Sequence, residues 1–451
     1  MRILMLTQYF PPETGAAQVR LLEIAKGIRA AGHEVEVVTA FPNHPEGIIP
    51  APYRGRFFRR DEVEGIPVYR TWIYPVPRGS FWKRLLNYFS FVFSAAWGIL
   101  KAGPADYLFV ESPPLFIGFT VMFARRVKRA KVIFNVSDLW PESAVSLGLV
   151  TNNTLIGLTT RLEEHLYKIS WRISTQTEGI VRTLQERGIP AEKLVLLPNG
   201  VDPALFQPGD PERRLVQELD LEGKFVILYA GTMGYAHGLE VALRAADILR
   251  RKEEGRDVVF LFVGDGSERP RLAKTAQELG LDNIRWVPFQ PLGEIHRYYN
   301  LADVSLSTLR RYKLAEGVRP SKVFPGLASA KPLIYVGEGE GAKIIRESGG
   351  GLVLPPEEPE RLAEAVLTLK SDPGLREEMG RRGREYVIRH YDWQSLVRRW
   401  LEGMGLLGDR RVESAAGRRE RGVSSGETEV SEQELRVIDQ ELGSNVGDRK
   451  P

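Results

Sequence analysis

The first forty residues, MRILMLTQYFPPETGAAQVRLLEIAKGIRAAGHEVEVVTA (1–40), decide the fold. The apolar run Ile3–Leu6 predicts a buried strand, and two prolines in the loop behind it exclude a helix there. Apolar residues at helical spacing follow, Gly32 ends that helix, and Val35–Thr39 predicts the next strand. Strand, loop, helix and strand form a βαβ unit, which belongs to a parallel sheet covered by helices.

A second series of the same kind begins after a polar, proline-containing stretch at 202–223. Phe225–Ala230 predicts its first strand, and a glycine-rich loop and a helix precede the strand Val258–Val263. The predicted fold class is therefore α/β, with two doubly wound Rossmann-like domains facing each other across a cleft. We expect an N-terminal domain at 1–202, a C-terminal domain at 203–384, an amphipathic helix at 385–408 that is a candidate to pack back on the first domain, and a disordered tail at 409–451.

The composition excludes several classes of site. The 451 residues contain no cysteine, which rules out disulfides, thiolate zinc sites and thiol nucleophiles. The six histidines are scattered and no Asp-x-Asp triplet occurs, so we predict no metal site. No apolar run reaches the ~20 residues of a membrane span. We therefore expect a cytoplasmic protein, peripheral on the inner face of the cytoplasmic membrane.

Residues 54–131 mix basic and aromatic side chains, and their net charge is +9. This mixture favours contact with an anionic membrane surface or with a lipid-diphosphate acceptor. The alternative is a core helix at Leu85–Leu100 beside a solvated basic face. A nucleic-acid partner is not expected, because the sequence contains no RNA- or DNA-binding motif.

Several stretches, taken in order along residues 1–405, resemble the family-4 retaining glycosyltransferases of the two-Rossmann-domain (GT-B) type. The run Asp138-Leu139-Trp140-Pro141-Glu142 is similar to the O-antigen and capsule branch of that family, which includes fucosamine-type transferases. The other matching stretches are the loop from Gln8 to Gly15, Pro198–Asp202 with Phe206, Tyr229–Gly231, Val263–Gly266, Leu301–Val304, and Pro320–Lys322 with Lys331-Pro332.

The resemblance implies a sugar transfer, with retention, from a nucleotide diphosphate donor to a hydroxyl of a growing cell-surface polysaccharide. A UDP-sugar carrying an N-acetylated amino or deoxy sugar is the expected donor, and a polyprenyl-diphosphate-linked or other glycan is the expected acceptor. No cofactor and no obligatory metal are expected. Two alternatives stay open: a nucleotide-sugar 2-epimerase of the same architecture, and a non-catalytic donor-binding subunit, since two glutamates of the family fall at Gly317 and Pro325 here.

Donor binding is expected in the second domain. Pro320 suits the first turn of a helix, whose N–H groups would stabilise the departing diphosphate together with Lys322. Arg319 is a second candidate cation, and Glu316 is a substitute for the missing glutamates. The alternatives to donor binding are purely structural: glycine turns, and a capped helix with a solvated lysine. The donor-binding candidates are Gly231, Thr232, His237, Gly264, Asp265, Gly266, Phe289, Arg319, Ser321 and Lys322, and the catalytic candidates are Asp138, Glu316 and Lys322.

Acceptor binding is expected in the first domain. The loop from Gln8 to Gly15 precedes a helix N-terminus, which can face a phosphate. Asp138 and Glu142 follow a predicted strand, so a carboxylate there could accept a proton from the acceptor hydroxyl, and Trp140 could stack on a sugar. The alternative is a helix start that Asp138 caps.

Overall fold

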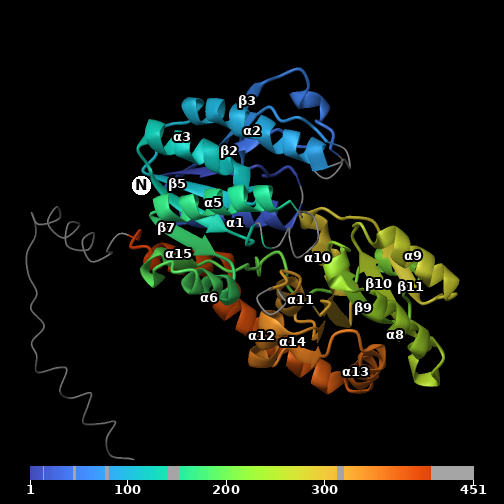
Figure 1. Ribbon diagram of the computed structural model, residues 1–451. Coiled ribbons are helices and arrows are strands. Elements are labelled where there is room, and N and C mark those ends of the chain that lie inside the picture. The colour runs from blue at the N-terminus through green and yellow to red at the C-terminus, as the bar shows by residue number, and fades with distance from the viewer. Residues whose placement is uncertain are drawn as a thin grey trace, which may run out of the picture. The chain divides into compact units, whose positions relative to one another are not determined.

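The computed structural model describes residues 1–13, 15–43, 47–76, 81–140, 142, 152–311 and 319–407. Within these ranges the chain forms an eight-stranded sheet from its N-terminal part and a six-stranded sheet from its C-terminal part. Helices pack on both sheets, as Figure 1 shows. The predicted fold class, two Rossmann-like α/β domains, is confirmed by this arrangement.

The N-terminal sheet has the strand order β3-β4-β2-β1-β5-β6-β7-β8. β3 runs antiparallel to β4, and the other neighbours are parallel. Its chain order reverses between β1 and β5, which opens a crevice beyond the carboxyl ends of these strands. The strands are β1 Arg2–Leu6, β2 Glu34–Ala40, β3 Phe58–Val63, β4 Ile66–Thr71, β5 Tyr107–Ser112, β6 Lys131–Val136, β7 Arg172–Thr175 and β8 Leu194–Leu196.

Five described α-helices belong to this N-terminal lobe. Two of them begin at side-chain caps: Asn152 accepts from the backbone N–H groups of Thr154 and Leu155, and Thr177 accepts from that of Ile180. The helices are α1 Ala16–Ala30, α2 Phe81–Lys101, α3 Gly118–Lys128, α5 Asn153–Ile169 and α6 Glu178–Glu186, with short 3₁₀ turns at Ala51–Tyr53, Leu115–Ile117 and Ala191–Lys193.

The C-terminal sheet has the order β11-β10-β9-β12-β13-β14 and is parallel throughout. Its chain order reverses between β9 and β12. The strands are β9 Phe225–Ala230, β10 Val258–Val263, β11 Ile284–Val287, β12 Val304–Thr308, β13 Leu333–Val336 and β14 Gly351–Leu354. The helices are α7 Arg213–Glu218, α8 Glu240–Arg250, α9 Arg269–Glu278, α10 Leu292–Leu301, α11 Val323–Ala328, α12 Gly339–Ser348, α13 Pro359–Ser371, α14 Pro373–Tyr391 and α15 Trp393–Gly403, with 3₁₀ turns at Tyr235–His237 and Glu253–Gly255.

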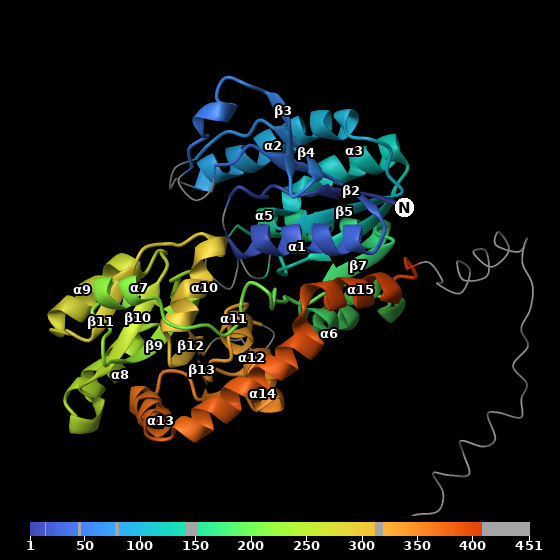
Figure 2. The same cartoon turned by 180° about the vertical axis from the view of Figure 1, so that it is seen from behind.

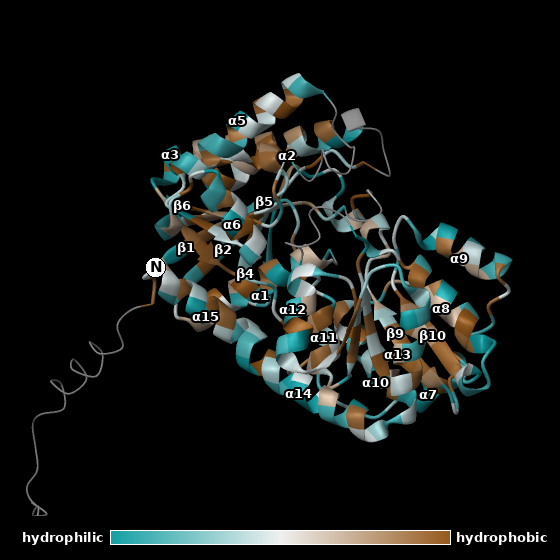
Figure 3. Ribbon diagram, turned by 60° about the horizontal axis from the view of Figure 1, so that its bottom comes forward, coloured by the Kyte–Doolittle hydropathy of each residue, from teal (hydrophilic) through white to brown (hydrophobic). Residues whose placement is uncertain are grey.

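The central strands of both sheets are apolar and buried. All six residues of β9 and all six of β10 are buried. In Figure 3 the strands of both lobes are mostly brown, while teal residues are frequent on the outer helices. Continuous apolar runs of this kind are expected where helices cover both faces of a parallel sheet.

Two segments connect the lobes. The first is the linker around Gly200 and Val201, and the second is the return from α14 to α15. They pair side by side, since Val201 N–H donates to the Tyr391 carbonyl at 2.9 Å. A Cβ at Gly200 would lie 2.6 Å from the same carbonyl oxygen, so this close approach requires glycine.

The last helix, α15, packs on α1 of the N-terminal lobe, as Figure 2 shows. Val397 contacts the helix backbone at Gly27, and the indole N–H of Trp400 donates to Ser174 Oγ at 3.1 Å. The apolar stripe of this helix is therefore buried on the first lobe. The tail expected at 409–451 lies outside the described residues.

Sequence patterns located the central strands but missed parts of the sheets. The β3–β4 hairpin and the strands β7, β11 and β14 are short or carry charged residues, so their apolar pattern is weak. None of the described helices combines the length and apolar character needed to cross a bilayer.

Candidate active site

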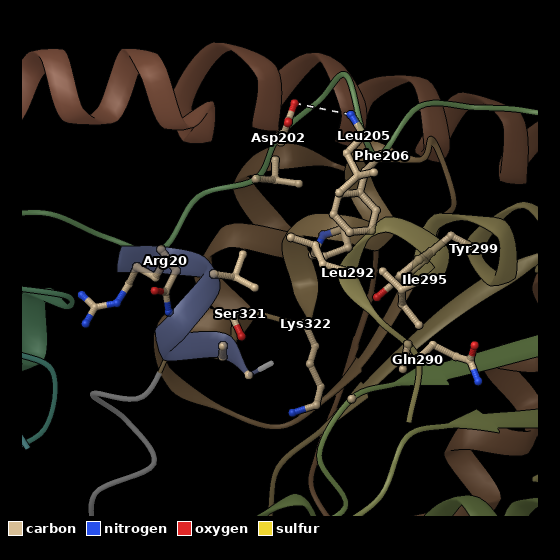
Figure 4. A pocket seen from close by; sticks show the side chains of 18 of the residues that line it. Arg20, Asp202, Leu205, Phe206, Gln290, Leu292, Ile295, Tyr299, Ser321 and Lys322 are labelled. Atoms are coloured by element: carbon tan, nitrogen blue, oxygen red, sulfur yellow. Dashed lines mark hydrogen bonds between the residues drawn. The ribbon is translucent and has the colours of Figure 1, made fainter. Parts of the chain in front are cut away.

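A cavity of about 230 Å³ lies between the two lobes, beyond the carboxyl ends of their strands. Figure 4 shows that α1 closes one side and that residues of the C-terminal lobe close the other. Its lining comprises Gly15, Ala16, Val19, Arg20 and Glu23 from the first lobe; Asn199–Asp202, Leu205 and Phe206 from the linker; and Ala230–Thr232, Val263, Gly264, Phe289, Gln290, Leu292, Ile295, Tyr299, Ser321, Lys322, Pro325 and Trp393.

Within the described ranges, Lys322 is one of the two cationic residues that line this pocket, together with Arg20. Its side chain passes Gly231, where a Cβ would come within 2.6 Å of Lys322 Cε. Its Nζ lies 5.7 Å from the ring centroid of Tyr229 and 2.9 Å from His237 Nε2. Burial lowers the pKa of Lys322 to about 8. Among the described residues no carboxylate pairs with this ammonium, so its charge is available to an anion that enters the pocket.

His237 lies behind Lys322 rather than in the pocket lining. Its Nδ1 is 3.1 Å from the backbone nitrogen of Gly234. Burial, and then the nearby charge of Lys322, lower the pKa of His237 to about 3. The imidazole is therefore neutral at physiological pH, and its predicted role as a donor-binding residue stays a prediction.

The loops after β9 and β10 meet through glycines. A Cβ at Gly264 would lie 2.1 Å from the carbonyl oxygen of Gly231, and one at Gly266 would lie 2.3 Å from that of Met233. Gly231 and Gly264 also have φ of +133° and +139°, which favours glycine. Both line the pocket, so backbone forms its floor. Thr232 lines it too, whereas Asp265 is exposed outside the lining.

The segment before α11 differs from the expected helix start. α11 begins at Val323, not at Pro320, and it has six residues. The N–H of Val323 already bonds to the carbonyl of Pro320, and that of Phe324 to Ser321, both at 3.4 Å. Stabilisation of an anion here therefore rests on Lys322 far more than on a helix terminus.

Arg319 does not face the pocket. Its guanidinium pairs with Glu340 at 2.7 Å, and the two side chains are 5% and 6% exposed. Glu340 also accepts from the backbone N–H of Gly179 at 2.7 Å, at the start of α6 in the other lobe. The expected role of Arg319 as a second phosphate ligand is thus corrected to that of a structural ion pair. Glu316 lies outside the described residues.

Aromatic and apolar groups form the opposite wall. Phe289 and Gln290 follow β11 and line the pocket, and their predicted place beside a nucleobase stays a prediction. The ring of Tyr299 packs edge-on against Phe206, with centroids 5.6 Å apart. Pro325 also lines the pocket.

The first lobe contributes one face of α1, with Gly15 at its N-terminal end. Arg20 on this face was not a candidate from the sequence. It forms a buried ion pair with Glu111 and contacts Ser137 Oγ at 2.5 Å, and Asn135 Nδ2 donates to Glu111 at 2.6 Å. Burial lowers the pKa of Arg20 and raises that of Glu111. In Figure 4 the guanidinium of Arg20 points away from Lys322. Arg20 and its partner Glu111 are 91 positions apart in the sequence, so a local sequence pattern could not reveal the pair.

The other acceptor candidates lie outside the pocket lining. The Gln8 side chain is buried and donates to Asn87 Oδ1 at 2.9 Å. Trp140 packs edge-on against Phe116, with ring centroids 6.1 Å apart, and Glu142 pairs with Arg187. The structure therefore does not bring these three residues to the pocket between the lobes.

Asp138 lies just beyond the carboxyl end of β6, and its side chain is exposed. It is not among the residues that line the pocket. Its predicted role as a base stays a prediction. In the part of the chain that the structure describes, no group of three or more histidine or acidic side chains is placed to hold a metal ion.

Comparison with known proteins agrees with this architecture. Residues 15–200 match the model of the glycosyl transferase 4-like domain, and residues 212–386 match that of the glycosyl transferases group 1. The chain belongs to the GT-B glycosyltransferases. The family resemblance seen in the sequence is confirmed at this level, and so is the prediction that the chain is an enzyme.

This glycosyltransferase is similar to named proteins and to solved structures. It is 27% identical over 418 residues, 89% of this chain and 99% of the relative, to a putative colanic acid biosynthesis glycosyl transferase, WcaI, of Escherichia coli. It is 30% identical over 39% of its length to an alpha-D-kanosaminyltransferase of Streptomyces kanamyceticus, covering 44% of that protein. The structure of Anabaena Alr3699/HepE in complex with UDP-glucose has a TM-score of 0.67 at 16% identity, covering 90% of this chain and 99% of that one.

Proposed function

We propose that this glycosyltransferase moves a sugar from a UDP-sugar to a glycan in the synthesis of a cell-surface polysaccharide such as O-antigen or capsule. The observation that carries the proposal is the ammonium of Lys322, which lines the interlobe pocket without a carboxylate partner among the described residues. The names of the relatives support it, since one is a colanic acid biosynthesis enzyme and the structure of another contains UDP-glucose.

The pocket suggests how the donor binds. The diphosphate would lie against Lys322, Ser321 and the backbone at Gly231, because these groups are the polar part of the pocket nearest the glycines. The base would lie against Phe289 and Gln290. The sugar would then face the N-terminal end of α1, which lines the pocket at Gly15 and Ala16.

The proposed reaction follows from the negative charge that develops on the leaving diphosphate. The bond between the anomeric carbon and the phosphate oxygen breaks, and Lys322 stabilises the charge that develops on the leaving diphosphate. The acceptor oxygen forms the new bond to the anomeric carbon on the same face. Its proton passes to the departing phosphate oxygen, or to Asp138 if that side chain reaches the acceptor. The configuration is then retained, which NMR of the product tests: inversion at the anomeric carbon contradicts this route.

Replacement of Lys322 tests the proposal. Lys322→Ala should lower kcat/KM for sugar transfer by about 10²–10³-fold, because the leaving group loses its cation. Lys274→Ala, on the exposed face of α9, is the matched control and should leave turnover unchanged. Equal activity of the two variants would remove the catalytic role of Lys322.

The alternatives from the sequence, an epimerase and a non-catalytic subunit, find no support among the named relatives, which are glycosyltransferases. Incubation with the UDP-sugar alone separates the cases. The proposed transferase leaves the sugar configuration unchanged when no acceptor is present, whereas epimerised donor would indicate the alternative activity.

We also propose that α2 rests on an anionic membrane surface, where a lipid-linked acceptor would be reached. One face of α2 is buried against the lobe, but Leu86, Phe93, Trp97 and Leu100 are exposed, with Phe93 at 76%. At helical periodicity these four lie within an arc of about 60°. Exposed basic residues occur on α2 and α3, namely Lys83, Arg84, Lys101, Arg125 and Arg126. The buried face of α2 therefore fits the core helix that was expected from the sequence. Its exposed apolar face, with basic residues nearby, fits the expected membrane surface.

Vesicle binding tests this surface. The protein should bind vesicles that contain phosphatidylglycerol and should dissociate as salt rises. Replacing Phe93 and Trp97 together by serine should weaken binding roughly tenfold or more, because two buried apolar side chains are lost. The control Leu158→Ser replaces an exposed apolar residue on α5 and should not weaken vesicle binding. Unchanged binding of the double variant would refute the surface.

A further inference from the structure

The amine of Lys322 lies next to a histidine side chain. The Nζ of Lys322 and the Nε2 of His237 are 2.9 Å apart, and His237 lies outside the pocket lining. His237 is itself held by the protein. The hydroxyl of Thr308 donates to its carbonyl at 2.5 Å, and the ring lies edge-on to Tyr229, with centroids 6.2 Å apart.

Two protonation patterns fit this geometry. A neutral imidazole carries one proton, so one ring nitrogen donates and the other accepts. With the proton on Nδ1, that nitrogen faces the Gly234 carbonyl at 3.3 Å, and Nε2 accepts from a charged Lys322. With the proton on Nε2, Nδ1 accepts from the Gly234 N–H at 3.1 Å, and Nε2 donates to an uncharged amine. Each state of the lysine therefore has a matching tautomer of the histidine.

We propose that His237 is a positioning residue: it holds the Lys322 amine above Gly231 and changes tautomer when that lysine gains the proton needed to bind the donor diphosphate. The proposal rests on the proposed function, since it deepens the role of the same site. His237 acts through Lys322 and makes no contact with the donor.

Most other charges around Lys322 are compensated by a partner of opposite charge. These pairs are Arg319–Glu340, Arg310–Glu240, Arg20–Glu111 and Lys26–Glu23. Asp202, which also lines the pocket, instead accepts from the backbone N–H of Ala204 at 2.9 Å. The phenol of Tyr229 donates to the carbonyl of Thr232 at 2.6 Å, and burial holds its pKa well above the usual value. A fall in UDP affinity as pH rises through about 8 therefore reports on Lys322, because the terminal phosphate of UDP loses its second proton at about pH 6 and is already charged there.

Calorimetric titration with UDP between pH 6 and pH 9.5 tests the proposal. In the wild type, UDP affinity should fall as pH rises through about 8, because Lys322 loses its proton there. His237→Leu removes the acceptor, so UDP should bind roughly ten- to a hundredfold more weakly. The fall should also move to lower pH by about one unit, since both states of the amine lose a hydrogen bond and the one from the charged amine is the stronger.

Conservative and control variants separate positioning from folding. His237→Gln keeps an oxygen that can accept from the amine, so it should restore most of the affinity and the wild-type pH profile. His165→Leu, an exposed histidine on α5, should match the wild type. Nitrogen NMR of His237 should show the Nδ1–H tautomer in the UDP complex.

Two results would overturn the inference. If His237→Leu binds UDP with the affinity and pH profile of the wild type while Lys322→Ala loses binding, His237 does not position the lysine and the proposed function stands. If Lys322→Ala also binds UDP like the wild type, the diphosphate does not lie at Lys322, and both the inference and the donor site are wrong.

Discussion

At the scale of single residues, the buried ion pair of Arg20 and Glu111 is a point in the N-terminal lobe that is especially sensitive to substitution. Arg20 and Glu111 are 2% and 4% exposed, and they pair beneath the face of α1 that lines the pocket. A buried charge that loses its partner retains the full cost of leaving water. The pair is therefore a sensitive point, although it need not add net stability compared with an apolar pair.

Removing one partner of this pair should be costly. Glu111→Ala should lower the free energy of unfolding by about 3–5 kcal/mol, because the guanidinium of Arg20 stays buried without a counter-charge. The double variant Arg20→Met/Glu111→Leu should recover most of that loss. Urea unfolding of both variants measures this, and a loss below about 1 kcal/mol in Glu111→Ala would show that water already reaches the site.

Glu163 on α5 gives a pH-dependent contribution. Burial raises its pKa to about 7, although the Tyr167 hydroxyl at 2.6 Å and Arg187 at 3.1 Å oppose this. Since the folded state holds the proton more tightly than the unfolded state, the free energy of unfolding falls as pH rises from about 4.5 to about 7. The sum is on the order of 3 kcal/mol. Glu163→Gln should flatten this part of the stability profile, and an unchanged slope would contradict the assignment.

At the scale of elements, α6 and α12 join the lobes through unequal contacts. Glu340 at the start of α12 is buried and links Gly179 to Arg319, next to the segment that carries Lys322. Three residues further along α12, Lys343 pairs with Glu178 at 3.2 Å, but both side chains are about half exposed. Solvent screens the second pair much more than the first.

This contrast predicts different costs for two neighbouring substitutions. Glu340→Ala should lower the free energy of unfolding by about 3–5 kcal/mol, since it leaves Arg319 buried and unpaired. It should also weaken UDP binding, because Arg319 precedes the donor segment. Lys343→Ala is the matched control on the same helix and should leave the urea midpoint nearly unchanged. Equal midpoints for the two variants would show that the buried bridge does not stabilise the interface.

The elements also show which features a sequence reveals. The strands β1, β9 and β10 are continuous apolar runs between turn signals, so their pattern is strong. The start of α11 could not be predicted from Pro320, because a loop that returns hydrogen bonds to its own carbonyls has the same local sequence. Arg20 and Glu340 became visible only through partners 91 and 21 or more positions away, which no local pattern encodes.

For the whole molecule, the order of short motifs predicted the two-lobed architecture and its pocket, while the chemistry within the pocket needed coordinates. Lys322, Ser321, Gly231, Gly264 and Phe289 were candidates from the sequence and meet in one cavity. The partnership of Lys322 with His237 joins positions 85 apart and was not foreseen.

Nucleotide binding gives a first test for the whole molecule, because a ligand that binds only the folded state raises its apparent stability. Any nucleotide that binds the native state alone raises the apparent stability of the whole body, by about 2.7 kcal/mol at a hundred times its Kd. UDP and UDP-sugars should therefore raise the melting temperature, and uridine without phosphates should raise it much less. A larger shift with uridine than with UDP would place the main binding energy away from the diphosphate.

The most direct measurement is a crystal structure of the chain with UDP. We predict that the two phosphates lie against the Lys322 ammonium, with Ser321 and the backbone of Gly231 around them and the base beside Phe289. Phosphates bound elsewhere, for example on the exposed basic residues of α2 and α3, would contradict the assignment of the second lobe as the donor site.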